Sequence, residues 1–353
     1  MSRLPSKKPS KLRKRPAIQY GPCWDFTKGL TQTSIELFRT CKEQFYLGVV
    51  EGWTPRAFST PLEFGTMFHF MLERIGSAPP DQIAREVTKS YHDTRKPSLD
   101  GTSYEALQMA MTNAQVLFPI YVDYYKGEDA KLSWLQREHI FKVPHRFVDY
   151  NGKTQEIMLT GMRDGEYRRE GVLGLFETKT KSSIDDVAIM DGLRGDFQTM
   201  LYLYALRCEY EEEPKEILYN IVRRPQLKLS TKKGETYDQY AERLAEDVKE
   251  RPDWYFRRFE VTVMDGDIDV FIRTSLDPVL REFHQWWGSI CSDPTKRWES
   301  LYHSRNLFGL MNKYGRCQLY NLMILGRTNE YFRRSSPFPE LDVYSQQQQT
   351  VEV

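Results

Sequence analysis

The feature that most constrains the fold of this 353-residue chain is a change of hydrophobic period near Leu132. Before this point apolar residues recur at helical spacing. After it they gather in three short β-rich runs, at residues 138–143, 156–164 and 172–179. Asn-Gly and Glu-Gly pairs separate these runs, and such pairs are typical of tight hairpin turns. The pattern therefore predicts three consecutive strands that form an antiparallel meander.

After the meander the chain alternates between helical and strand patterns. We expect, in order, a helix at 197–210, a strand at 216–223, a helix at 237–250, a strand at 256–263 and a long helix from 268 to about 291. Strands joined first by hairpins and then by a helix cannot form a purely parallel or purely antiparallel sheet. The predicted fold class is therefore α/β (α+β), with a mixed central β-sheet flanked by helices.

The N-terminal third is predicted to be mostly helical. Thr33 and Glu36 are spaced as a capping box, and helices are expected over residues 62–75 and 104–125. The whole chain then divides into five segments: a basic flexible arm (1–30), an N-terminal helical region (31–130), a sheet-containing core (131–290), an aromatic and basic C-terminal element (291–335) and a flexible tail (336–353).

The net charge of +1 conceals a strongly basic N-terminus. The first 16 residues hold seven Lys or Arg and no acid, which leaves 43 basic against 49 acidic residues in the rest. Such an arm either meets nucleic acid or aids solubility, and its composition favours neither. No apolar run approaches the ~20 residues of a membrane-spanning helix, and none follows the basic residues as in a secretory signal. We therefore expect a cytoplasmic protein without a membrane partner.

The third predicted strand has two charged residues, Glu177 and Lys179, at its C-terminal end. Strand alternation places Glu177 and Lys179 on one face, and Asp164 ends the preceding strand, so that a turn over 165–171 brings its carboxylate near Glu177. Carboxylates held this close repel each other unless a cation lies between them, and Mg²⁺ prefers oxygen ligands of this kind. The sequence thus predicts a magnesium site. The alternative is an exposed hairpin with a surface Glu–Lys pair.

The spacing of these residues resembles a known family. Gly161-Met-Arg-Asp164, followed after twelve residues by Glu177-Thr-Lys179, is similar to the metal-binding motif of the PD-(D/E)XK nuclease superfamily. An upstream Gly65-Thr-Met-Phe-His69-Phe-Met-Leu-Glu73 and a downstream Gln198-Thr-Met-Leu-Tyr202 resemble motifs of its RecB-like exonuclease branch, phage enzymes included. Residues 34–46 look like the opening helix of that branch. The resemblance extends roughly over residues 31–265.

The resemblance implies a restriction-endonuclease-like core and a role for each matched residue. It implies that Mg²⁺ or Mn²⁺ is held by four groups: His69, Asp164, Glu177 and the backbone carbonyl of Thr178. Lys179 is then the catalytic residue that positions the attacking water and stabilises charge developing on the phosphate, with Asp164 and Glu177 acting beside it.

Further residues are expected to support this site. His69 and Glu73 share a helix face, so that Glu73 can orient His69 or a nearby water, and Glu138 matches a carboxylate of the first core strand. Gln198 and Tyr202 also share a face, where they would hold the lysine or contact a DNA strand. In the alternative interpretation, His69 is a packed core histidine and the Gln–Tyr pair is the polar edge of an amphipathic helix.

The sequence departs from the family pattern at two points. Arg163 precedes Asp164 at a position where many members have proline. Residues other than proline are common at this position in the RecB-like branch. Some relatives hold a 4Fe–4S cluster with one cysteine before the core and three after it. Here Cys41 fits the first position, but only Cys291 and Cys317 follow the core, 26 residues apart. The ligand set is incomplete, so we expect reduced thiols and no cluster.

Taken together, the resemblance implies a divalent-metal-dependent DNA nuclease, an exonuclease that acts in DNA recombination, repair or processing. It implies DNA as substrate and a single-strand annealing or recombination protein as partner, in the host cytoplasm for a phage-encoded chain. Two alternatives remain open at this stage. One is a nucleic-acid-binding protein of the same fold whose catalysis has lapsed, and the other is an unrelated α/β enzyme in which Glu177 and Lys179 form a structural pair.

Overall fold

A computed structural model describes residues 23–56, 59–95, 100–292, 305–312, 315–338 and 341. Its centre is a five-stranded sheet of β2 (Ser133–Val148), β3 (Thr154–Arg169), β4 (Val172–Lys181), β5 (Glu216–Arg223) and β6 (Phe256–Thr262). The strands lie in the order β2-β3-β4-β5-β6, and only the β4–β5 pair is parallel. The predicted meander and the mixed sheet are therefore confirmed.

The β3–β4 hairpin is tighter than the sequence suggested. Glu170 and Gly171 have φ angles of 52° and 85°, which two-residue hairpin turns with positive φ require. The expectation that Asp164 ends its strand before a turn over 165–171 was wrong, because β3 continues to Arg169. The continuation pairs Tyr167 with Gly174 and buries its ring, so these residues are strand rather than turn. Asp164 consequently lies in mid-strand.

Most of the elements that precede β2 in the sequence are helices, in agreement with a mostly helical N-terminal third. They are η1 (Phe26–Lys28), α1 (Gln32–Thr40), α2 (Lys42–Phe45), the π-helical turn η2 (Tyr46–Val50), α3 (Thr60–Glu73), α4 (Pro80–Arg95) and α5 (Gly101–Asp129), with the short strand β1 (Trp53–Pro55) between η2 and α3. The capping box of α1 is formed by Thr31 and Ser34, not by Thr33 and Glu36 as predicted. The helix begins earlier than expected because the chain turns directly after Leu30, which pairs with Leu159 of β3.

Helices also fill the connections after β4. They are α6 (Asp186–Leu193), α7 (Phe197–Tyr210), η4 (Thr231–Lys233), α8 (Tyr237–Glu250), α9 (Pro252–Tyr255), α10 (Asp267–Phe271), the π-helical turn η5 (Ile272–Leu276) and α11 (Asp277–Ser292). The predicted long C-terminal helix is thus continuous from α10 to α11 with a π-helical turn inside it. Within the described residues no helix combines the length and apolar character needed to cross a membrane.

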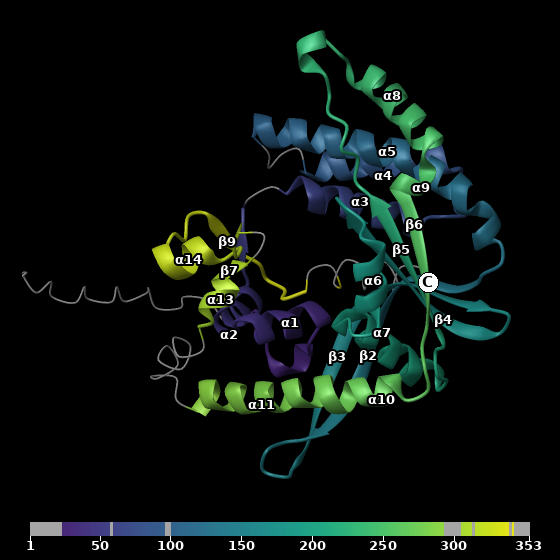
Figure 1. The fold of residues 1–353 in the computed structure, drawn as a ribbon. Helices are drawn as coiled ribbons and strands as arrows, with labels where there is room; N and C mark the ends of the chain where they lie inside the picture. The colour runs from purple at the N-terminus through teal and green to yellow at the C-terminus, as the bar shows by residue number, and fades with distance from the viewer. Residues whose placement is uncertain are drawn as a thin grey trace, which may run out of the picture.

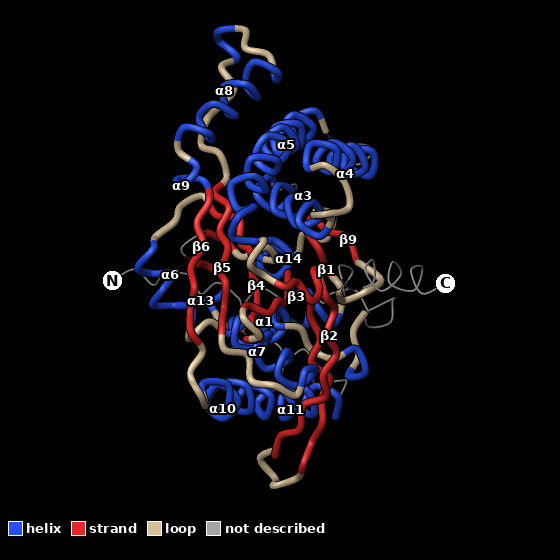
Figure 2. Tube along the Cα trace, turned by 90° about the vertical axis from the view of Figure 1, so that its right-hand side faces the viewer, coloured by secondary structure: helices blue, strands red, loops and turns tan. Residues whose placement is uncertain are grey.

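The helices form two groups on either side of the sheet (Figure 1). Helices α3, α4, α5 and α8 lie at the top of that view, whereas α7, α10 and α11 lie below, and the quarter turn in Figure 2 keeps the groups apart. Each group encloses its own apolar core. One core contains Phe68 and Phe118 together with Val222 of β5, and the other contains Leu175 of β4 together with Leu203 of α7. The site forms on the sheet between α3 of one group and α7 of the other.

The ends of the chain pack differently from the predicted segments. Residues 1–22 of the predicted arm and most of the predicted tail lie outside the described residues. The expectation that the arm extends to residue 30 was wrong, because Trp24 is fully buried and packs edge-on against Phe45, Phe283 and Trp287. An indole anchored among three aromatic rings holds residues 23–30 on the core.

The described part of the C-terminal element lies beside α1 and α2 (Figure 1). It consists of α13 (Leu307–Leu310), β7 (Met311–Asn312), β8 (Gly315–Arg316), α14 (Tyr320–Leu325) and β9 (Tyr331–Arg333), and β9 pairs with β1. Arg305 forms an ion pair with the buried Glu43, and Gln44 donates to the carbonyl of Gly309 at 3.0 Å. These contacts join the end of the chain to its first helices.

Candidate functional site

Three carboxylates, one each on β2, β3 and β4, lie side by side across the sheet. The β2–β3 register places Glu138 opposite Asp164, and Glu177 of β4 directly follows Phe176, which pairs with Gly165 beside Asp164. Glu138 and Glu177 are 3% and 1% exposed, and the Asp164 side chain is 10% exposed. The backbone of Glu138 has φ 48°, an uncommon conformation for a residue other than glycine, in mid-strand. A row of buried acids across three strands costs free energy unless positive charge compensates it.

A histidine from α3 closes one end of this row. His69 Nδ1 lies 3.3 Å from Glu138 Oε1 and 3.4 Å from Asp164 Oδ1, and the three side chains form a group that could hold a metal ion. One turn earlier, a Cβ on Gly65 would approach Thr180 Oγ1 of β4 to 3.0 Å. Glycine at this position therefore lets α3 lie close enough to β4 for the histidine to reach the acids.

A lysine closes the other end of the row. Lys179 Nζ donates to Glu177 Oε1 at 2.5 Å and to Gln198 Oε1 at 2.8 Å. Gln198 in turn donates to the Tyr202 hydroxyl at 3.1 Å. The amide of Thr178 donates to Asp164 Oδ2 at 2.6 Å, which fixes that carboxylate against β4. The helix α7 thus orients the ammonium group that the strand presents.

Burial and mutual repulsion shift the protonation of the acids. Burial and the Asp164 carboxylate raise the pKa of Glu177 to about 7, against the opposing charge of Lys179. Burial likewise raises the pKa of Glu138 and of Asp164. These directions are those expected of carboxylates that share a desolvated site.

The pKa values of His69 and Lys179 are raised, although burial by itself would lower both. Burial alone would lower the pKa of His69, but the Asp164 and Glu138 carboxylates raise it to about 9. Burial is likewise overcome at Lys179, where Glu177 and Asp164 raise the pKa above its usual range. All of these shifts favour the protonated forms, so the negative charge of the cluster is not fully compensated by the groups of the site.

The donor set fits a divalent cation. Glu138 Oε2 and Glu177 Oε2 are buried and have no hydrogen-bond partner. Buried polar atoms are rarely left without a partner, and a carboxylate oxygen in that state is a ready ligand for a hard cation. The residues that fit are His69, Glu138 and Asp164, whose side chains converge, together with Glu177, which offers a buried oxygen without a partner.

The side chains of His69, Asp164 and Glu177 open into a pocket of about 810 Å³. His69 and Gly65 of α3 line it from one side, and Gln198 and Tyr202 of α7 line it from another. Asp164, Glu177, Thr178 and Lys179 line it from the sheet. Glu73 lies one turn beyond His69, and its charge contributes to the raised pKa of Glu138. The structure therefore brings the predicted site residues together, and their roles stay predictions.

One charged residue that lines the pocket was not predicted from the sequence. Arg95, at the end of α4, lines the pocket and pairs with the buried carboxylate of Glu63, with its Nε 3.0 Å from Glu63 Oε2. The hydroxyl of Tyr91 donates to the same carboxylate. A basic residue at a helix end is common in any sequence, so no local signal marks Arg95. Only the packing of α4 on α3 directs it to the pocket.

A second acidic group lies apart from the pocket. His139, Glu166 and Glu209 are close enough together to hold a metal ion, but the fully buried Arg163 already lies among them. Its Nη2 donates to Glu166 Oε1 at 2.5 Å and to Glu209, and the Tyr210 hydroxyl donates to Glu166 Oε2 at 2.7 Å. The guanidinium takes the place of a cation there. The arginine that stands where many family members have proline therefore anchors β3.

The cysteines bear on the expected absence of an iron–sulfur cluster. Cys41 is buried, and burial together with the nearby Cys41 raises the pKa of Cys317. Cys291 is exposed near the end of α11, and residues 293–304 lie outside the described residues. The absence of a cluster stays a prediction.

Comparison with known proteins adds a family match. A family model of the PD-(D/E)XK nuclease superfamily matches residues 29–267. No curated protein matches the chain. Solved structures match as well, among them the crystal structure of SSO0001, which is 12% identical, covers 60% of this chain and 74% of its own, and has a TM-score of 0.25. A TM-score of that size supports no structural argument, so the family match carries the assignment.

Proposed function

Because the chain belongs to the PD-(D/E)XK nuclease superfamily, we propose that it is a DNA exonuclease of the RecB-like, phage type. Members of this superfamily generally hydrolyse phosphodiester bonds with divalent metal ions, and the mixed sheet with flanking helices agrees with their restriction-endonuclease-like fold. The observation that carries the proposal is the row of three carboxylates, two of them buried, between a histidine and a lysine.

We assign the metal ligands from the donor atoms in this row. His69, Asp164, Glu177 and the backbone carbonyl of Thr178 are the proposed ligands, as expected from the motif, and the unpartnered oxygen of Glu138 adds a fifth. Four oxygen donors and one imidazole nitrogen suit Mg²⁺ or Mn²⁺. When bound, such an ion polarises a phosphate and lowers the pKa of a coordinated water.

The remaining chemistry belongs to side chains of the chain. Lys179 stays protonated at neutral pH because Glu177 and Asp164 raise its pKa, so its ammonium group is a permanent donor. Gln198 and Tyr202 hold this group at the edge of the pocket, where it would orient the attacking water and stabilise charge on the phosphate oxygens. The intact set of Asp164, Glu177 and Lys179 is the reason to prefer an active nuclease over a lapsed one.

The exonuclease mode and the biological setting are the finer parts of this proposal. The RecB-like order of motifs, from Gly65–Glu73 through Asp164 and Glu177 to Gln198–Tyr202, supports them. They include action in the host cytoplasm and a single-strand annealing or recombination protein as partner. Linear DNA ends would then be the natural substrate.

Digestion of end-labelled linear and circular DNA tests the proposal. We expect cutting of linear DNA with Mg²⁺ or Mn²⁺ and none in EDTA, and circular DNA should stay intact. Lys179→Ala should abolish cutting, whereas Lys142→Ala, at an exposed lysine of β2, should cut as the unmodified chain does. Cutting of circular DNA would replace the exonuclease with an endonuclease. Activity in Lys179→Ala would refute the assignment of the site.

A further inference from the structure

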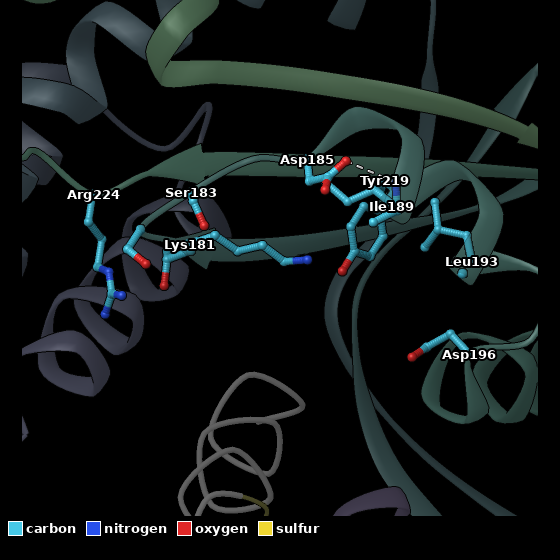
Figure 3. A pocket seen from close by; sticks show the side chains of 12 residues that line it. Lys181, Ser183, Asp185, Ile189, Leu193, Asp196, Tyr219 and Arg224 are labelled. Carbon is cyan, nitrogen blue, oxygen red and sulfur yellow. Dashed lines mark hydrogen bonds between the residues drawn. The ribbon is translucent and has the colours of Figure 1, made fainter. Parts of the chain in front are cut away.

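A second hollow adjoins the catalytic pocket. It has a volume of about 550 Å³ and lies beyond the carboxyl ends of the parallel strands β4 and β5 (Figure 3). Thr180, the residue after the catalytic lysine, lines both cavities. A strand of substrate that leaves the catalytic pocket along β4 therefore enters this hollow directly. Crevices at the carboxyl ends of parallel strands are common ligand sites in mixed sheets.

Two cationic side chains line the hollow at the ends of these strands. Lys181 ends β4 and Arg224 follows β5, and the Arg224 amide donates to the Lys181 carbonyl at 2.8 Å. Arg224 is half-buried, and within the described residues no side chain accepts a hydrogen bond from its guanidinium or forms an ion pair with it. Burial lowers its pKa without an opposing carboxylate. An arginine that is desolvated and lacks an anion is suited to bind one.

The positions of the two lysines match a polynucleotide backbone. Lys179 and Lys181 point to the same face of β4 and are roughly 7 Å apart along the strand. The Lys181 ammonium lies 5.6 Å from the centre of the Tyr219 ring, and Figure 3 shows its side chain running across the hollow. Consecutive phosphates of one strand can thus meet one cation in each cavity.

Two acidic side chains of the hollow favour the binding of an anion at the end where Arg224 lies. Asp185 caps α6 by accepting from the Ala188 amide at 3.1 Å, and Asp196 caps α7 by accepting from the Thr199 amide at 2.8 Å. Both carboxylates are therefore engaged as helix caps. In Figure 3 Arg224 lies at one side of the hollow and Asp196 at the other. A phosphate is repelled from the Asp196 side and drawn to the Arg224 side.

Apolar side chains line the space between the two ends. Ile189 and Leu193 of α6 and Tyr219 of β5 are 8%, 4% and 7% exposed and face the hollow. An aromatic ring and two aliphatic side chains form the kind of surface on which a nucleobase packs. The hollow thus offers a cationic end and an apolar wall, as a single nucleotide requires.

We propose that this hollow binds the nucleotide next to the scissile phosphate, with its phosphate on Arg224 and Lys181 and its base against Tyr219. The hollow, with a volume of about 550 Å³, is the neighbouring cavity into which a DNA strand passes from the catalytic pocket. The proposal rests on the proposed nuclease function, and it adds a binding site for the nucleotide beside the scissile phosphate.

Binding of a fluorescein-labelled oligothymidylate in Ca²⁺, followed by anisotropy at several salt concentrations, tests the site apart from catalysis. Arg224→Gln should weaken binding about tenfold and lower the slope of log K against log salt by about 0.7, the value for one contact on a single strand. Lys181→Gln should lower the slope by a similar amount. Arg224→Lys keeps the charge and should restore the slope, and Lys142→Gln on β2 should leave both affinity and slope unchanged.

The outcomes separate this proposal from the nuclease assignment. Unchanged affinity and slope in both Arg224→Gln and Lys181→Gln overturn the nucleotide site, even where the unmodified chain cuts DNA. A fall in slope confined to these two variants supports the site, even where cleavage is not seen. Mn²⁺ affinity, measured by calorimetry in the same variants, should stay as in the unmodified chain, and an equal loss of Mn²⁺ binding would show that the substitutions act through the fold and overturn the proposal.

Discussion

Replacement of Arg163 by methionine tests how the sheet is anchored beside the site. The Arg163 side chain is 0% exposed and donates to Glu166 Oε1 through Nη2 at 2.5 Å and Nε at 2.8 Å, and it also pairs with Glu209. Arg163→Met keeps the length of the side chain and removes its charge. The fully buried Glu166 then keeps only His139 and Tyr210 as partners. Removal of one partner from a buried pair costs about 3–5 kcal/mol of unfolding free energy.

The pKa of Glu166 gives a second measure of this cost. Burial alone would raise that pKa, but the hydrogen bond from His139, the charge of Arg163 and the Tyr210 hydroxyl hold it at about 2 against an ordinary 4.5. The difference corresponds to on the order of 3 kcal/mol of stability at neutral pH, shared among these three partners. Because the pKa is depressed, this stability is present above pH 4.5 and is lost as the pH falls towards 2. In Arg163→Met the pKa of Glu166 should rise, so that less of this stability is present at neutral pH.

Urea unfolding at pH 7 and pH 5 measures both effects. We expect Arg163→Met to unfold about 3 kcal/mol more easily at pH 7 with an unchanged m-value, and the deficit should shrink at pH 5, where the stranded Glu166 carboxylate takes up a proton more readily. The double variant Arg163→Met with Glu166→Gln removes the stranded charge and should recover much of the loss. A single variant within about 1 kcal/mol of the unmodified chain would refute the reasoning. A double variant no more stable than the single one would do the same.

Three further predictions concern the site itself. Lys179→Ala should lower the rate of DNA cleavage by at least about 10²-fold with little change in melting temperature, as seen by gel assay and calorimetry. Mn²⁺ binding at pH 7.5 should release a proton, because the pKa of His69 is about 9 and a ligand imidazole must be neutral. Calorimetry in buffers of different ionisation enthalpy measures this release, and affinity should rise with pH. Gly161→Ala should destabilise the fold by about 1–3 kcal/mol in urea, because its Cβ would lie 2.8 Å from the buried ring of Phe141. The control Gly192→Ala meets no atom within 4 Å and should not destabilise.

Much of the architecture was predictable from the sequence because it depends on short-range patterns. The bounds of α7, β5 and α8 agree with the predicted ranges, since alternation and helical period record which side chains are buried. The same alternation identified Glu177 and Lys179 as neighbours on one face. The errors fell at the ends of elements, such as the capping box of α1 and the turn after β3, where one or two residues decide the outcome.

Contacts between distant segments were decided by the tertiary structure alone. The sequence suggested Glu138 as a supporting residue, but its place beside Asp164 depends on the β2–β3 register and on the bulge between Trp134 and Gln136. His69 meets these acids only because α3 packs closely on β4. Arg224 likewise meets the end of β4 through the parallel pairing of two strands joined by more than thirty residues. Local patterns determine which side of an element is buried, and packing over long distances determines which charged groups meet there.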